Sequence, residues 1–310
     1  MRTPWPAAGF DRFTREQWAQ RADAAGGDPF ASATSAAAAA GEPVTPDEVA
    51  SVYAPLCRLV ETMEELRQAQ AGRTGPFRLG GHRPRPLMIG IAGGVAVGKS
   101  TAARVVQSLL SRQGARTVEL ISTDAFLFPN RVLEAQGLAG RKGFPETYDR
   151  GALLAALAAI RSGHHPVTVP VYSHRAYDIL DGEVRSIDGP DMAVVEGLTV
   201  LQTGTADDPD PRVVSDFIDL AVYIDAEEED AAAWHTERLL ALRAAGGEGP
   251  FARWLSSLSD EEAAQLARAS WSEINLVNLR RYVAPTARRA HVVLRKDRAH
   301  RVEEVLVRLP

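Results

Sequence analysis

Short apolar runs alternate along the chain with longer segments in which apolar residues recur every three or four positions. Five uninterrupted runs predict buried β-strands, at residues 87–92, 118–122, 192–195, 220–224 and 291–294. Strands of a parallel sheet have this pattern because helices cover both of their faces. Helical spacing marks the segments 101–112, 150–161, 228–244, 260–281 and 299–308. The alternation predicts an α/β fold, with a mostly parallel, doubly wound sheet flanked by helices.

The chain before the first strand has a different pattern. Residues 11–22 form one candidate helix, and a clearer one begins at Thr45, where apolar residues follow at helical spacing. The alanine-rich segment 24–41 predicts a mobile loop or a weak helix. Residues 71–86 are rich in Gly, Pro and Arg and predict a linker.

These patterns predict two parts. We expect residues 1–86 to be an N-terminal helical extension and linker packed on the core. Residues 87–310 are expected to form the core itself, with lid helices at about 228–281. A chain of 310 residues is long enough to bury a core of this size.

Composition and charge narrow the class of protein. The hydrophobic content of 45% and the charged content of 24% are typical of a soluble globular protein. A net charge of -5 leaves no general basic surface, so we expect no nucleic-acid partner. Cys57 is the one cysteine, which excludes an intrachain disulfide and fits a reducing compartment. With no run of 18 apolar residues and no secretory signal at the start, we expect no membrane span and a cytoplasmic location.

The strongest chemical signal is a glycine-bracketed loop between a predicted strand and a predicted helix. Its sequence is Gly93-Gly94-Val95-Ala96-Val97-Gly98-Lys99-Ser100, the Walker A pattern. Glycines permit the backbone angles that turn successive N–H groups inward as a nest for phosphate. The Lys99 ammonium can reach the β- and γ-phosphates of ATP, and the Ser100 hydroxyl can bind Mg²⁺. Only three of the 35 basic residues are lysines, so a lysine here indicates a need for a compact ammonium.

Further polar residues follow the strands, at the sheet edge where doubly wound proteins bind ligands. Asp124 could accept a proton from an attacking hydroxyl or hold Mg²⁺ through water, and a turn or cap is the alternative. Glu196 closes an apolar strand, which favours the Mg²⁺ sphere, with a structural ion pair as the alternative. Arg238 could reach a phosphoryl group from a lid helix, although a solvated arginine is the simpler interpretation. His174, alone in a loop, is more often an ordinary histidine than a ligand.

At this point the chain resembles the bacterial, P-loop type of pantothenate kinase. The resemblance extends well beyond the phosphate loop, to residues 95–105, 123–124, 141–148, 170–174, 196–202, 273–279 and 294–300. It covers most of residues 8–308. Proteins of this family phosphorylate the terminal hydroxyl of pantothenate with ATP and Mg²⁺, which opens coenzyme A synthesis. Coenzyme A inhibits them in competition with ATP, and the resemblance also implies a homodimer.

The resemblance assigns roles to individual residues. Asp124 would be the catalytic base, Lys99 and Arg238 would stabilise the moving phosphoryl group, and Ser100 and Glu196 would hold Mg²⁺. The implied nucleotide-binding residues are Gly93, Gly94, Val95, Ala96, Val97, Gly98, Lys99, Ser100, Thr101 and His300, the last against adenine. The implied pantothenate-binding residues are Asp124, Tyr172, His174, His235 and Asn278. Arg104 would contact coenzyme A as feedback inhibitor.

One departure from the family pattern concerns the acceptor. His235 follows Trp234 where the family usually has tyrosine. Histidine changes charge near neutral pH, so we expect a protonated His235 to attract the pantothenate carboxylate. The Michaelis constant for pantothenate would then rise as the pH increases. Two alternatives stay open: a related kinase of another small alcohol or nucleoside, and a nucleotide-binding regulator without catalysis.

Overall fold

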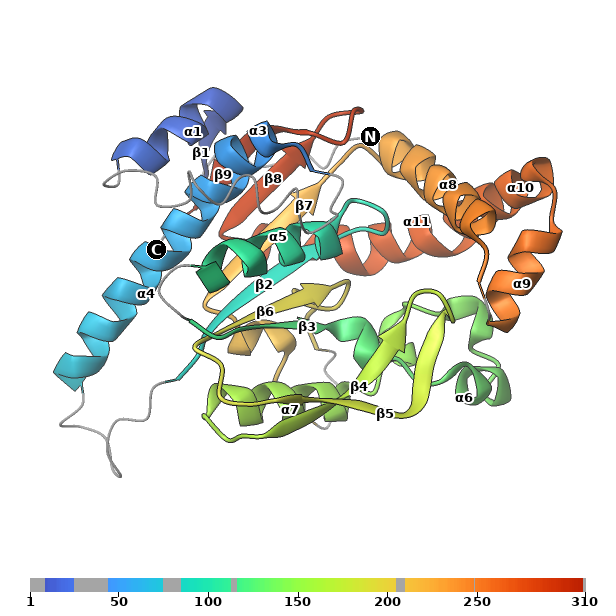
Figure 1. Cartoon of the computed structure of the whole chain (residues 1–310), viewed down its shortest axis with the longest axis horizontal. Coiled ribbons are helices and arrows are strands. Elements are labelled where there is room, and N and C mark those ends of the chain that lie inside the picture. Colours follow the sequence, from blue (N-terminus) through green and yellow to red (C-terminus); the bar gives the residue numbers. More distant parts are fainter. Residues whose placement is uncertain are drawn as a thin grey trace.

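The computed structural model describes residues 9–24, 44–74, 85–112, 116–204, 210–247 and 249–308. Its centre is a seven-stranded sheet in the order β1-β9-β8-β7-β2-β6-β3 (Figure 1). The strands are β1 Asp11–Thr14, β2 Leu87–Gly93, β3 Val118–Ser122, β6 Met192–Gly197, β7 Leu220–Asp225, β8 Val292–Lys296 and β9 Val302–Val307. The five strands β3, β6, β2, β7 and β8 are parallel to one another. Strand β9 is antiparallel to β8, and β1 is antiparallel to β9. The predicted α/β fold with a mostly parallel sheet is confirmed.

Helices cover both faces of this sheet (Figure 1). The side chains of β2 alternate between two cores, with Leu87, Ile89 and Ile91 in one and Met88 and Ala92 in the other. This is the double coverage that an uninterrupted apolar strand requires. The first core takes residues from α4 Ala54–Thr74 and α5 Lys99–Arg112, and the second from α7 Arg150–Arg161.

The other helices form two groups. One group precedes the core in the sequence, and the other lies at the end of the sheet where β2 leads into α5 (Figure 1). Those before the core are α1 Arg15–Ala24 and α3 Pro46–Glu48, which runs through a π-helical turn into α4. Those beside the sheet end are α6 Asn130–Ala135, α8 Glu228–Ala245, α9 Pro250–Ser257, α10 Asp260–Ser270 and α11 Leu276–Asn278. A separate hairpin of β4 Val167–Ser173 and β5 Asp178–Ile187 lies near α6.

Some predicted elements are wrong. Residues 299–308 were expected to be helical, but they contain β9, which bonds to β8 on one side and β1 on the other. The candidate helix at 11–22 begins with β1 and becomes helical only from Arg15. Helix α4 continues to Thr74, into the expected linker. The alanine-rich segment lies almost wholly outside the described residues, and the proposed division at residue 86 stays a prediction.

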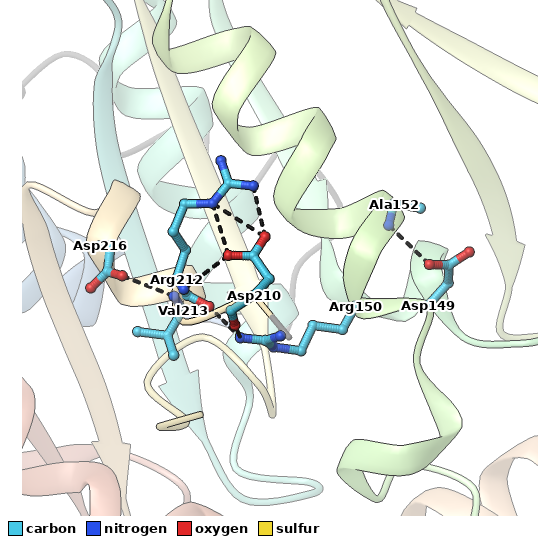
Figure 2. A network of polar contacts seen from close by, with 7 residues as sticks. All are labelled: Asp149, Arg150, Ala152, Asp210, Arg212, Val213 and Asp216. Atoms are coloured by element: carbon cyan, nitrogen blue, oxygen red, sulfur yellow. Dashed lines mark hydrogen bonds and ion pairs between the residues drawn. The ribbon is translucent and has the colours of Figure 1, made fainter. Parts of the chain in front are cut away.

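Polar contacts fix the loop that leads into β7. Figure 2 shows Arg150 at the start of α7 donating to the backbone carbonyls of Asp210, at 2.9 Å, and Arg212. Beside it, the Asp149 carboxylate accepts a 2.9 Å hydrogen bond from the Ala152 amide and caps α7. Within the described residues, none of the helices has both the length and the apolar character that a membrane span needs.

Candidate active site

The loop of residues 93–98 joins β2 to α5, as the Walker A pattern predicts. Gly93 has a φ of +152°, and a Cβ there would lie 2.7 Å from the Ile224 carbonyl oxygen, so no other residue fits. The Lys99 ammonium donates a 2.6 Å hydrogen bond to the Gly94 carbonyl. Burial lowers the pKa of Lys99, whereas Glu196 and Asp124 act in the opposite direction. The loop therefore holds the Lys99 ammonium by a backbone hydrogen bond, near the carboxylates of Glu196 and Asp124.

The two carboxylates reach this lysine from neighbouring strands. Because β6 lies between β2 and β3, Glu196 is paired with Ile91 on one side and Ser122 on the other. Glu196 is 4% exposed, and its Oε1 accepts a 3.2 Å hydrogen bond from the Ser100 hydroxyl. Burial and the nearby charge of Asp124 raise the pKa of Glu196, which Lys99 counteracts. A cation beside Ser100 and Glu196 would stabilise this buried carboxylate.

Asp124 lies in the 3-10 turn Thr123–Phe126 that follows β3. Ser122, not Asp124, caps this turn by accepting a 3.3 Å bond from the Asp124 amide. The Asp124 carboxylate instead accepts a 3.3 Å hydrogen bond from the Tyr148 hydroxyl and lines a cavity. The capping role that the sequence left open for Asp124 is thus taken by its neighbour.

That cavity has a volume of about 410 Å³ and lies between the phosphate loop, the β4–β5 hairpin and the helices α8 to α10. Of the expected site residues it collects Val95, Ala96, Lys99, Ser100, Asp124, Tyr172, His174, Glu196, His235 and Arg238. Further lining residues are Lys142, Tyr148, Tyr177, Leu239, Leu242, Phe251 and Trp254. One end is therefore charged and the other largely apolar.

The β4–β5 hairpin and the loop before it supply one side of the cavity. The rings of Tyr172 and His174 meet edge to face, with centroids 5.2 Å apart. Burial lowers the pKa of His174. Lys142 donates to the Tyr177 carbonyl at 2.5 Å, and burial lowers the pKa of its ammonium to about 8. Tyr177 in turn stacks on Phe251 of α9, with centroids 4.8 Å apart.

Two residues of α8, three positions apart, face the same cavity. His235 lies 3.0 Å from the Ser270 hydroxyl through its Nε2 atom, and Arg238 lines the wall beside it. Burial and the charge of Arg238 lower the pKa of His235. The titration expected for His235 is therefore shifted to lower pH, because its surroundings favour the neutral ring. A neutral His235 can still exchange hydrogen bonds with a ligand.

Eight expected residues lie outside the cavity lining. Five belong to the phosphate loop and the start of α5, namely Gly93, Gly94, Val97, Gly98 and Thr101, and the others are Asn278, Arg104 and His300. Asn278 is 3% exposed, donates a 2.7 Å bond to the Gly143 carbonyl, and leaves its buried Oδ1 without a hydrogen-bond partner. Arg104 is exposed on α5, near enough for its charge to act on His174. His300 lies at the Ala96 side of the phosphate loop, where its ring stacks on Trp234 with centroids 3.9 Å apart.

Comparison with known proteins identifies the family. Residues 88–260 match the sequence profile described as the phosphoribulokinase/uridine kinase family. A protein named pantothenate kinase from Rhodopseudomonas palustris (strain BisA53) is 45% identical over 306 residues, which cover 96% of this chain and 95% of that protein. Its counterpart from Parvibaculum lavamentivorans is 46% identical over 275 residues, covering 86% and 84% of the two chains.

Solved structures show the same fold at lower identity. The YGR205w protein superposes with a TM-score of 0.53 at 16% identity, over 82% of this chain and 99% of its own. D-glycerate 3-kinase from Cryptococcus neoformans gives 0.51 at 14% identity, over 79% and 97%. The fold is that of the P-loop kinases, and the relatives at 45% and 46% identity are named pantothenate kinase. The chain belongs to the pantothenate kinase family.

Proposed function

We propose that this chain transfers the γ-phosphoryl group of ATP to the terminal hydroxyl of pantothenate, the first step of coenzyme A synthesis. The observation that carries the proposal is the convergence of Lys99, Asp124 and Arg238 on one cavity whose far end is apolar. In such a cavity an alcohol and a triphosphate can meet in line, while apolar walls exclude water. Names of relatives at about 45% identity support pantothenate as the alcohol.

The reacting groups have separate tasks in this proposal. Asp124 takes the proton of the acceptor hydroxyl while the oxygen of that hydroxyl forms a bond to the γ-phosphorus of ATP. The bond between that phosphorus and the β,γ-bridging oxygen breaks, and ADP leaves. Lys99 and Arg238 stabilise the negative charge that develops on the transferring group. The Tyr148 hydroxyl orients Asp124 through the 3.3 Å hydrogen bond.

The nucleotide would lie along the phosphate loop, with residues 93–101 around its phosphates and His300 near adenine. The donor set suits Mg²⁺, because Ser100 and Glu196 offer hard oxygen ligands and the Glu196 carboxylate is buried. When bound, the ion would neutralise charge on the phosphates.

For the acceptor, Tyr172, His174, His235 and Asn278 supply the polar contacts. The unpaired Oδ1 of Asn278 is a candidate acceptor for a hydroxyl or amide proton of the ligand. Burial and Arg238 favour the neutral form of His235, so recognition of the pantothenate carboxylate would rest on hydrogen bonds. Any rise of the Michaelis constant with pH should then lie at lower pH than for an ordinary histidine. From the family we also propose feedback inhibition by coenzyme A through Arg104, a homodimer and a cytoplasmic location.

A coupled assay of ADP release tests the proposal against its alternatives. Pantothenate, uridine and small sugar alcohols are each supplied with ATP and Mg²⁺. We expect pantothenate to be turned over at least about 100-fold more efficiently than the others, since the polar groups of this site match one acceptor. Preference for uridine or a sugar alcohol would identify a related kinase of different specificity. If no compound in the panel supports ADP release, only nucleotide binding would be left.

A further inference from the structure

Two buried ionisable residues that do not line the catalytic cavity influence each other's charge close to the phosphate loop. Lys296 ends β8 and Glu48 ends α3, and each is 5% exposed. Glu48 and Asp297 favour the charged form of Lys296, but burial dominates and lowers its pKa to about 8. The Glu48 carboxylate also accepts a 3.4 Å hydrogen bond from the Val302 amide. Through this pair the N-terminal helical region contacts the end of the core sheet.

The Lys296 ammonium connects to the phosphate loop through His300. Its Nζ lies 3.0 Å from His300 Nδ1, and His300 Nε2 lies 3.2 Å from the Ala96 carbonyl oxygen. An ammonium can only donate, so Nδ1 must be the acceptor, and the neutral ring then carries its proton on Nε2. That proton points to the Ala96 carbonyl. Burial and the charge of Lys296 lower the pKa of His300, which favours the neutral ring.

Ala96 is a position that needs such a contact. Its φ of +66° is costly for a residue with a Cβ, by about 1 kcal/mol. In a trans peptide the Ala96 carbonyl and the Val97 N–H point in opposite directions. A bond that holds this carbonyl on the His300 side therefore turns the Val97 N–H to the other side, where a phosphate nest needs donors. Gly98 makes room for the arrangement, because a Cβ there would lie 3.0 Å from Lys296 Nζ.

We propose that Lys296, neutralised by Glu48, is a positioning residue for ATP: it selects the tautomer of His300 that holds the Ala96–Val97 peptide in its phosphate-binding orientation. The inference rests on the proposed ATP-dependent function, but it concerns nucleotide affinity and not the choice of acceptor. It also gives the N-terminal region a part in the nucleotide site, through Glu48.

The test uses two paired variants of the full-length enzyme. Removing one charge would leave the other buried and unpaired, so both are neutralised together. Glu48→Gln with Lys296→Met removes the donor to His300, whereas Glu48→Gln with Lys296→Gln keeps an N–H donor. Calorimetry measures the binding of a non-hydrolysable ATP analogue with Mg²⁺ and without acceptor. We expect about tenfold weaker binding for the methionine pair and a change within about threefold for the glutamine pair, with the Michaelis constant for pantothenate unchanged in both.

Unchanged affinity for the analogue in a folded methionine pair would overturn the inference, as would equal losses in both pairs. If the wild type binds the analogue but phosphorylates no pantothenate, the proposed function fails while the inference stands. A second measurement needs no stable variant of the pair. In ¹⁵N NMR of histidine-labelled wild type, with His300 assigned from His300→Gln, we expect the Nε2–H tautomer at pH 7. The Nδ1–H tautomer or a charged imidazolium would refute the proposal.

Discussion

Replacing Asp124 with asparagine separates proton transfer from binding. The amide keeps the shape of the side chain but cannot accept the proton of the acceptor hydroxyl. General base catalysis contributes about 10²- to 10⁴-fold, so turnover should fall by a factor in this range, or about 3–5 kcal/mol in the barrier. The hydrogen bond from Tyr148 is a smaller part of the loss, because a 3.3 Å bond contributes about 1 kcal/mol.

The assay is ADP release at saturating ATP and pantothenate, combined with calorimetry of ATP-analogue binding. Nucleotide affinity should change by less than about threefold, because Glu196 still opposes the charge of Lys99. Asp149→Asn is the matched control: it makes the same chemical change at a neighbouring carboxylate that caps α7 outside the cavity (Figure 2). Asparagine caps a helix as well as aspartate, so this variant should keep its turnover.

Tyr148→Phe isolates the contribution of the orienting hydroxyl. Its turnover should fall only about fivefold, in line with the weak bond that it removes. Normal turnover in Asp124→Asn together with lost nucleotide affinity would refute the reasoning and make Asp124 a metal or structural residue. The reasoning would also fail if Tyr148→Phe reproduced the whole loss, since orientation alone would then explain it.

The other predictions address the loop, the fold, the inhibitor and the pH. Lys99→Ala should lower turnover at least about 10³-fold with an unchanged circular dichroism spectrum, and near wild-type turnover would contradict the phosphate-loop assignment. Gly197→Ala places a Cβ 1.8 Å from Thr123 Oγ1, and urea unfolding should show a loss of more than about 3 kcal/mol. Arg104→Ala should weaken inhibition by coenzyme A in steady-state kinetics at fixed ATP, so an unchanged inhibition constant counts against its role. Burial lowers the pKa of Lys296 from 10.5 to about 8, so between these values the unfolded chain binds a proton that the folded chain has released. Urea unfolding should therefore show the wild type gaining stability relative to the Glu48→Gln, Lys296→Met pair as the pH rises across this window.

The strands of the parallel sheet were predictable because burial of both faces leaves an unbroken apolar run. The mistake at β9 shows the limit of that signal. Val302, Val305 and Leu306 fit helical spacing equally well, and pairing with β8 and β1 decides in favour of the strand. The hairpin of β4 and β5 gives no clear run, because many of its residues are half-buried or exposed. Local pattern reports how a segment is covered, but not which distant segment it pairs with.

The charged end of the site could be predicted for a similar reason. Asp124 and Glu196 follow strands of one parallel sheet, and the topology alone brings such positions to the edge that holds the phosphate loop. Local pattern alone does not show the apolar end, because Tyr177 and Phe251 come from a hairpin turn and a short helix placed only by tertiary contacts. The shift in the pKa of His235 could not be predicted for a related reason. Its pKa is set by burial and by Arg238, neither of which is visible in the order of residues.

One compositional signal turns out to mark the site more fully than the Walker A pattern does. The chain has 35 basic residues, and its three lysines are Lys99, Lys142 and Lys296. Burial lowers the pKa of all three. Lys99 follows the phosphate loop, Lys142 contacts the turn of the β4–β5 hairpin, and Lys296 contacts His300. An arginine could replace none of them easily, because its guanidinium is larger than an ammonium and stays charged when it is buried. In a chain that uses arginine on its surface, a lysine therefore indicates a position where a compact cation is packed inside the protein.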